Sequence, residues 1–237
     1  MAEQSPCWRD VEEALGAGLK RLLLYGPTGT GKTFAALTMG EPTLSRRLVC
    51  TEDLTSGDIL GTWMPSGPDR WGFHEGPAIQ AWRGQNGEGG RLVVDEVDRA
   101  SGDALSQLLN VTDSELSARW INPETLQTVQ PGPEFSVVMT TNVSDPWEIP
   151  QALRDRFPVA IKIDQPPIAA VEKLSADLRT AALAGTVTGD DRRLSLRALY
   201  AFDDLRRALN EDRAAELVFG RDRSSDIIDA LRISRVD

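Results

Sequence analysis

The sequence predicts an α/β fold, in which a five-stranded parallel sheet is flanked by helices and followed by a small all-helical region. Five short apolar runs alternate with segments of helical spacing, and this alternation is typical of parallel sheets covered on both faces. After Pro166 and Pro167, every remaining segment has helical spacing. We therefore expect residues 1–165 to form an α/β core and residues 166–237 to form a helical subdomain.

The expected elements follow from the apolar spacing and from the Gly and Pro residues that interrupt it. Strands are expected at residues 21–25, 47–51, 91–95, 135–141 and 159–163. Helices are expected at 8–19, directly after Gly31, and at 77–83, 101–112, 168–184, 195–209 and 211–232. Residues 116–130 are predicted to form a hairpin. The Gly-, Pro- and Trp-rich segment 55–90 is predicted to hold little regular structure apart from its brief helix, and such segments are usually functional.

Composition excludes several classes of protein. The 237 residues include 36 acidic and 26 basic side chains, a net charge of −10 that makes direct binding to nucleic acid an unfavoured role. No apolar run approaches the roughly 20 residues that span a bilayer, and the polar start has no signal-peptide stretch. Two Cys and one His are too few for a zinc site with four N or S ligands. We expect a soluble protein of a reducing cytoplasm, without membrane contact.

The segment Gly26-Pro-Thr-Gly-Thr-Gly-Lys32-Thr33 fits the phosphate-binding loop pattern, and it lies between a predicted strand and a predicted helix as that pattern requires. Glycines let backbone N–H groups turn toward phosphate oxygens. Lys32 can reach the β- and γ-phosphates, and the Thr33 hydroxyl can coordinate Mg²⁺. The predicted nucleotide-binding residues here are Gly26, Pro27, Thr28, Gly29, Thr30, Gly31, Lys32, Thr33 and Phe34.

Two later strands end in polar residues that complete this site. Asp95 and Glu96 follow an apolar run, so Asp95 can hold Mg²⁺ and its water shell while Glu96 polarises the attacking water. Asn142 ends the next strand, where it could orient the lytic water or the γ-phosphate. A turn-forming Asn is the alternative interpretation. The sequence thus predicts an ATP site with Mg²⁺ held by Thr33 and Asp95.

With these motifs the sequence resembles AAA+ ATPases, and within them the dynein-related, MoxR-like branch. The resemblance covers nearly the whole chain. Besides the loop, it rests on Asp58-Ile-Leu-Gly61, Glu75–Gly84, Val94–Ala100, Thr140-Thr-Asn142, Ala152–Phe157 and Leu196-Arg-Ala198. It implies a P-loop NTPase core with a helical C-terminal lid. The chain lacks the Asn-Lys-x-Asp pattern that reads guanine, which favours ATP over GTP.

The resemblance implies roles for further residues. Asn142 corresponds to the first sensor, an arginine before Phe157 to the arginine finger, and Arg197 to the second sensor, with the adjacent arginines 192 and 193 as alternatives. Arg154 and Arg156 are two residues apart and point in different directions on a helix, so both are not expected to touch one phosphate. Arg156 is the favoured finger, and Arg154 is expected to be a neighbouring contact or an ion-pair partner.

The resemblance also implies how the protein works. Relatives form rings, usually hexamers, that remodel or activate partner proteins, often proteins with a von Willebrand A domain. Segment 55–90 and the hairpin 116–130 correspond to elements that face the ring centre or a partner. The aromatic and methionine side chains of segment 55–90 either contact such a partner or pin the segment to the core; these are Trp63, Met64, Trp71 and Phe73. The alternatives are the motor subunit of a nucleic-acid-processing, McrB-like complex, and a nucleotide-gated scaffold without hydrolysis.

Overall fold

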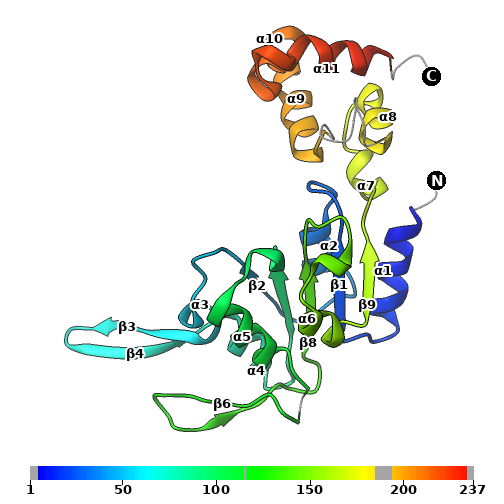
Figure 1. The fold of residues 1–237 in the computed structure, drawn as a ribbon. Helices are drawn as coiled ribbons and strands as arrows, with labels where there is room; N and C mark the ends of the chain where they lie inside the picture. The colour runs from blue at the N-terminus through cyan, green and yellow to red at the C-terminus, as the bar shows by residue number, and fades with distance from the viewer. Residues whose placement is uncertain (1–4, 115, 185–193, 234–237) are drawn as a thin grey trace. The chain divides into compact units, whose positions relative to one another are not determined.

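The computed structural model describes residues 5–114, 116–184 and 194–233. The chain divides into two compact units (Figure 1). The sheet unit comprises residues 10–26 and 32–162, and the helical unit comprises residues 1–9, 27–31 and 163–237. The helical unit thus includes the start of the chain and the loop 27–31, which the predicted division after residue 165 assigned to the core.

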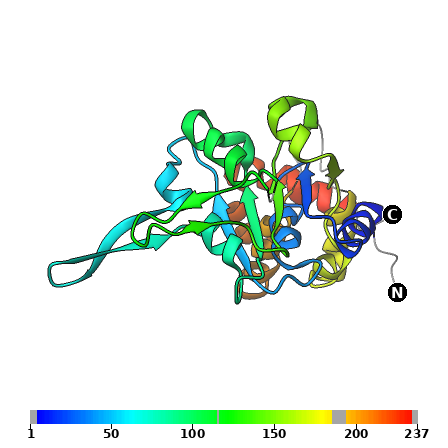
Figure 2. The ribbon, with the colours of Figure 1, turned by 90° about the horizontal axis from the view of Figure 1, so that it is seen from below.

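The sheet has five parallel strands in the order β2-β5-β8-β1-β9 (Figure 1, Figure 2). Its strands are β1 (Arg21–Tyr25), β2 (Ser45–Val49), β5 (Arg91–Asp95), β8 (Ser136–Thr140) and β9 (Val159–Lys162). This sheet confirms the predicted fold class. The second strand begins two residues earlier than predicted, because its pairing with β5 starts at Ser45 opposite Arg91.

Helices lie on both faces of this sheet. Neighbouring strand residues point to opposite faces. The Ser45 hydroxyl donates to the Leu37 carbonyl in α2, whereas the Arg46 guanidinium donates to Gln80 in α4. Helices α2 and α4 therefore cover opposite faces. The helices of this part of the chain are α1 (Pro6–Gly16), α2 (Lys32–Thr38), α3 (Ser56–Leu60), α4 (Pro77–Arg83), α5 (Gly102–Val111) and α6 (Gln151–Arg156). Short 3₁₀ turns follow β5 at Val97–Arg99 and precede α6 at Pro146–Glu148.

Because all five strands run in one direction, the sheet has two chemically different edges. Gly26, Cys50, Glu96 and Thr141 directly follow β1, β2, β5 and β8, so they meet at the carboxyl edge. The opposite, amino edge holds the first residues of the strands, where Leu22 of β1 pairs with Val159 of β9. The edges are separated by the length of β1, about 15 Å for a strand of this size.

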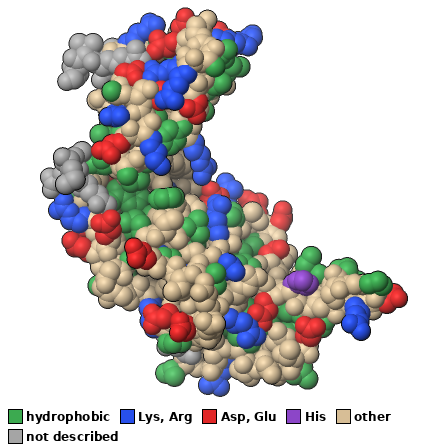
Figure 3. Space-filling view, turned by 180° about the vertical axis from the view of Figure 1, so that it is seen from behind, with side chains coloured by type: hydrophobic (Ala, Val, Ile, Leu, Met, Phe, Trp, Pro, Cys, Tyr) green, Lys and Arg blue, Asp and Glu red, His purple; other side chains and the backbone are tan. Residues whose placement is uncertain are grey.

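Segment 55–90 is more regular than predicted. It forms an antiparallel hairpin of β3 (Gly61–Gly67) and β4 (Arg70–Glu75) after α3, so the expectation of little regular structure was wrong. The hairpin projects from the rest of the sheet unit (Figure 1), and it carries the single His of the chain, His74 (Figure 3). The sequence does not predict this hairpin, because β3 buries neither of its faces and therefore lacks the alternation of apolar and polar residues that marks a strand.

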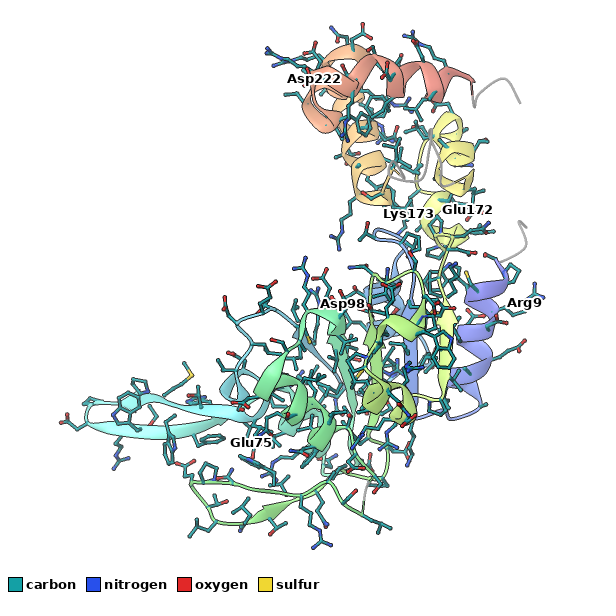
Figure 4. The ribbon with its side chains drawn as sticks, viewed as in Figure 1. Arg9, Glu75, Asp98, Glu172, Lys173 and Asp222 are labelled. Carbon is teal, nitrogen blue, oxygen red and sulfur yellow. The ribbon has the colours of Figure 1, made fainter. Side chains whose placement is uncertain are left out.

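A second, shorter hairpin of β6 (Trp120–Ile121) and β7 (Thr128–Val129) lies beside the root of the first, as predicted for residues 116–130. Glu75 connects the two hairpins (Figure 4). Its carboxylate accepts hydrogen bonds from Arg83 at 2.8 Å and from the Asn122 amide at 3.1 Å. The rings of Phe73 and Trp120 add a contact with centroids 5.5 Å apart. The two hairpins are thereby joined at their bases.

The helical unit contains α7 (Ile168–Val171), α8 (Ala176–Ala184), α9 (Leu196–Ala208), α10 (Glu211–Phe219) and α11 (Arg221–Ile233). Two long helices predicted here are each broken in two. The helix expected at 168–184 is interrupted before Ser175, whose backbone N–H and hydroxyl both donate to Asp203. The helix expected at 211–232 stops at Gly220, which has a φ of 86° that L-residues avoid.

Asp203 is the buried polar centre of the helical unit, with a side chain only 3% exposed. Besides Ser175, it accepts a hydrogen bond from Arg206, which also pairs with Asp177. Burial raises the pKa of Asp203, but the hydrogen bonds from Ser175 and Arg206 outweigh burial and leave the pKa below its ordinary value. The stability that this carboxylate contributes is therefore present above its unfolded pKa of about 3.9 and is lost as pH falls through the lower folded value.

We predict that Asp203→Asn destabilises the helical unit by about 2 kcal/mol, because an amide is a weaker acceptor for the Ser175 and Arg206 donors. Hydrogen–deuterium exchange of the α8 and α9 amides measures the change. The control is Asp204→Asn, whose exposed carboxylate lies 3.7 Å from an exposed arginine and should matter by less than about 0.5 kcal/mol. Equal protection in the two variants would contradict the assignment of Asp203 as the centre of this unit.

Candidate nucleotide-binding site

The loop between β1 and α2 has the backbone geometry of a phosphate cradle. Gly29 has a φ of 74° and Gly31 a φ of 99°, a region that other residues rarely adopt. A side chain at Gly29 would also collide with Ser195, since its Cβ would lie 2.5 Å from the Ser195 Cβ. The Thr30 hydroxyl closes the turn by donating to the Pro27 carbonyl at 3.1 Å. Both the conformation and the space at Gly29 therefore require glycine.

Lys32 begins α2 directly after the loop, and its side chain is buried. Its Nζ donates to the carbonyl of Gly26 at 2.8 Å, so the ammonium reaches back to the end of β1, where the loop starts. A lysine ammonium has three donors and a compact charge, which suits it to phosphate oxygens. The position of Lys32 fits a nucleotide with its phosphates in this loop.

Thr33 and Asp95 meet at the carboxyl edge of the sheet, as the sequence predicts for a metal site. The Thr33 hydroxyl donates to Asp95 Oδ1 at 2.8 Å, and the Thr140 hydroxyl donates to the same oxygen. A hydroxyl beside a carboxylate supplies the hard oxygen atoms that Mg²⁺ prefers, with the remaining positions left to water and phosphate. The residues present therefore fit Mg²⁺, which when bound would offset phosphate charge.

Negative charge is concentrated around Asp95. Burial raises the pKa of its carboxyl, but hydrogen bonds from Thr140, Arg47 and Thr33 outweigh burial and leave the pKa below the ordinary value. Burial and the neighbouring carboxylates of Asp95, Asp98 and Glu96 raise the pKa of the Cys50 thiol to about 12. Asp95 is therefore ionised at neutral pH, as a metal-binding carboxylate must be, and Cys50 is a neutral thiol.

Glu96 directly follows β5, and Asn142 lies two residues after the end of β8 at the same edge of the sheet. Glu96 has a left-handed backbone, with φ 57° and ψ 47°, and its N–H donates to the Thr140 hydroxyl at 3.2 Å. Its half-buried carboxylate lies 3.3 Å from Arg99. Asp98, labelled in Figure 4, accepts a hydrogen bond from the Thr141 hydroxyl beside Asn142. A non-glycine residue in this conformation stores strain, which is common at functional sites.

The two candidate finger arginines lie at the end of α6. Arg154 stacks over the exposed ring of Trp147, 4.2 Å from its centroid, and donates to the Ile149 carbonyl. Arg156 donates to the Ala152 carbonyl, and its guanidinium lies 3.7 Å from Asp113. Its Nε is a buried nitrogen without a hydrogen-bond partner among the described residues. The two side chains point to different neighbours, in line with their spacing on the helix.

Two predicted residues are exposed. Phe34 in α2 is 65% exposed and packs on no core. Arg197 is exposed in the first turn of α9, two residues after Ser195, the residue that approaches Gly29 in the helical unit. The helix that carries Arg197, the predicted second sensor, thus begins next to the loop glycine Gly29. The alternatives at 192 and 193 lie outside the described residues.

Sequence reasoning missed one residue of this centre, Arg47 in β2. Its Nε and Nη2 donate to Asp95 Oδ2 at 3.0 and 2.5 Å. The contact depends on the register in which Val49 pairs with Asp95, and a single sequence does not reveal that register. An arginine in the strand expected at 47–51 was the available signal.

The family model of the AAA domain, dynein-related subfamily, matches residues 21–157, a span that runs from β1 through α6 and includes the loop, Asp95, Glu96 and Asn142. The chain belongs to this AAA family. Membership makes it an ATP-hydrolysing enzyme with a P-loop nucleotide-binding core, and it explains why the polar residues gather at one edge of the sheet.

Relatives of this AAA protein align over most of its length. An uncharacterized protein of Staphylococcus saprophyticus is 30% identical over 225 residues, which cover 83% of this chain and 82% of that protein. An uncharacterized protein of Staphylococcus aureus is 29% identical over 221 residues, covering 82% and 81%. These relatives support the family without adding an activity.

Solved structures share the fold at low sequence identity. NtrX from Brucella abortus in complex with ATP has a TM-score of 0.56 and 14% identity, covering 99% of this chain and 68% of that chain. A RuvB variant from Thermotoga maritima has a TM-score of 0.51 and 18% identity, covering 96% and 67%. This AAA chain spans 45% of a further structure, an ATPase candidate from Cytophaga hutchinsonii, with a TM-score of 0.46.

None of the described helices of this AAA protein is both long and apolar enough to cross a membrane.

We predict that Glu96→Gln leaves ATP binding nearly intact and lowers turnover by at least about a hundredfold, because an amide cannot accept a proton from water. Calorimetry with ATP and a steady-state phosphate-release assay measure the two effects. Glu88→Gln changes an exposed glutamate away from the site and serves as the matched control. Normal turnover in Glu96→Gln would place the general base at another residue.

Proposed function

We propose that this AAA protein is a ring-forming Mg-ATPase that couples ATP hydrolysis to the remodelling or activation of a partner protein, as MoxR-like proteins do. The ring is proposed to be a homohexamer with ATP sites at the subunit edges. The cofactors are ATP and Mg²⁺, held by the loop with Lys32, and by Thr33 and Asp95. We also propose that it works in a reducing cytoplasm, which is supported by its two buried, free cysteines.

The observation that carries this proposal is the edge of the sheet at which Arg156 lies. Arg156 is close to Asp113, whose backbone carbonyl accepts a hydrogen bond from Arg21 at the start of β1. Helix α6 ends three residues before β9, which also begins at this amino edge. The phosphate loop starts at the opposite end of β1, about 15 Å away. Arg156 therefore lies at the edge of the sheet opposite to Gly26, where the phosphate loop starts, and a finger role requires a neighbouring subunit.

The projecting hairpin supports a partner protein as the object of this work. Trp63, Met64 and Trp71 are 44%, 47% and 62% exposed, which does not fit the interpretation that they pin a loop to the core. Phe73 instead packs against Trp63 with centroids 5.8 Å apart and stiffens the hairpin. Exposed aromatic side chains on a rigid element are typical of protein-binding surfaces. The net charge of −10 favours a protein over nucleic acid as the object.

We predict that Arg156→Ala keeps the ATP affinity of the isolated subunit but lowers turnover by about 10³-fold or more, as removal of an arginine finger does. The test mixes Arg156→Ala subunits with Glu96→Gln subunits, each inactive alone. Some interfaces then combine an intact Glu96 site with an intact Arg156, so phosphate release should partly return. If mixed rings form and no activity returns, Arg156 acts within its own subunit or has only a structural role. Arg154→Ala in the same mixture decides between the two arginines.

The partner is tested with Glu96→Gln as a trap. We expect the ATP-loaded variant to assemble into a larger ring by light scattering and to retain a partner protein, with proteins carrying a von Willebrand A domain as the first candidates. Lys32→Ala, which cannot bind the phosphates, is the matched control and should retain none. Salt-dependent binding of DNA by the ring, without a protein partner, would instead favour the nucleic-acid-processing motor. Slow phosphate release by the wild type would favour the nucleotide-gated scaffold.

A further inference from the structure

Asp95 is engaged by its own chain on both carboxylate oxygens. Oδ1 accepts the hydroxyls of Thr33 and Thr140, and Oδ2 accepts two N–H groups of Arg47. Each oxygen of the carboxylate therefore has two hydrogen-bond partners within the chain. Arg47 thereby fixes which oxygen faces Thr33, and only the Oδ1 side is shared with the predicted metal ligand.

The ion pair is unequal in burial. The Asp95 side chain is 4% exposed, whereas that of Arg47 is 46% exposed on the edge strand β2. Arg47 thus keeps much of its contact with water, while its charge acts on a carboxylate that is almost fully shielded. Asp95, Glu96 and Asp98 lie close together at this edge, where Arg99 pairs with Glu96 at 3.3 Å and Arg47 pairs with Asp95. Arg47 offsets one of these charges at the carboxylate itself.

We propose that Arg47 is a positioning residue of the magnesium site, which orients Asp95 through Oδ2 and lowers the affinity of the site for Mg²⁺. A guanidinium that shares a carboxylate with a divalent ion repels that ion, and over a few ångströms this repulsion weakens its binding by roughly tenfold even at the dielectric constant of water. Weaker binding of the metal favours its release together with the product nucleotide. The inference rests on the proposed assignment of Asp95 to Mg²⁺.

The test measures the free Mg²⁺ concentration that half-saturates binding of ADP, followed by calorimetry at fixed ADP without any turnover. Arg47→Ala should lower this concentration by about tenfold, and Arg47→Lys, which keeps the charge, should stay within about threefold of the wild type. Arg46→Ala is the matched control, because Arg46 points to the opposite face and donates to Gln80. An unchanged or higher Mg²⁺ requirement in Arg47→Ala would overturn the proposal.

A second variant covers the case in which Arg47→Ala does not fold. Arg47→Gln keeps an N–H donor for Oδ2 without the charge, and it should also lower the Mg²⁺ requirement; a value equal to the wild type would overturn the proposal. Asp95→Asn separates the two assignments. If Asp95→Asn raises the Mg²⁺ requirement and Arg47→Ala changes nothing, only the role of Arg47 fails. If Asp95→Asn also changes nothing, the magnesium assignment itself fails.

Discussion

The candidate site depends on the hydrogen bonds and the ion pair that compensate the charge of one buried carboxylate, Asp95, at the end of β5. Asp95 is almost fully buried, and an ionised carboxylate without partners would be very costly there. Its partners come from α2, from β8 and from β2, so a single charge ties together a helix and two strands that are distant in sequence. The same compensation keeps the carboxylate ionised and therefore able to bind a cation.

The common direction of the five strands determines at which edge of the sheet each candidate site residue lies. It collects the residues that end β1, β5 and β8 at one edge, and it places the start of β9 and the end of α6 at the other. The start of the phosphate loop and Asp95 thus lie at the edge of the sheet opposite to Arg156. In the proposed ring, a neighbouring subunit would bring these two edges together.

The sequence predicted the parts of this protein whose determinants are local. The glycines of the loop, the apolar run before Asp95 and the α4 start at Pro77 each depend on neighbouring residues, and the structure has them where they were expected. The contact between Arg47 and Asp95 depends on strand register, which long-range packing decides. The hairpin of β3 and β4 was not predicted, because neither strand buries a continuous face and the usual alternation of apolar and polar residues is missing. The helix breaks at Ser175 and Gly220 could not be predicted from local sequence. The first depends on hydrogen bonds to the distant Asp203, and the second depends on the positive φ of Gly220.

Because the two hairpins are joined at their bases, they would turn together about that point. Glu75 connects β4 to Arg83 in α4 and to Asn122 in the shorter hairpin, so a displacement of α4 is transmitted to both hairpins together. The seven residues of β3 extend about 23 Å from the joined bases. A rotation of about ten degrees at the base would move the hairpin tip by about 4 Å over such a length. A rotation at the joined bases would therefore move the exposed aromatic side chains farther than it moves the bases themselves.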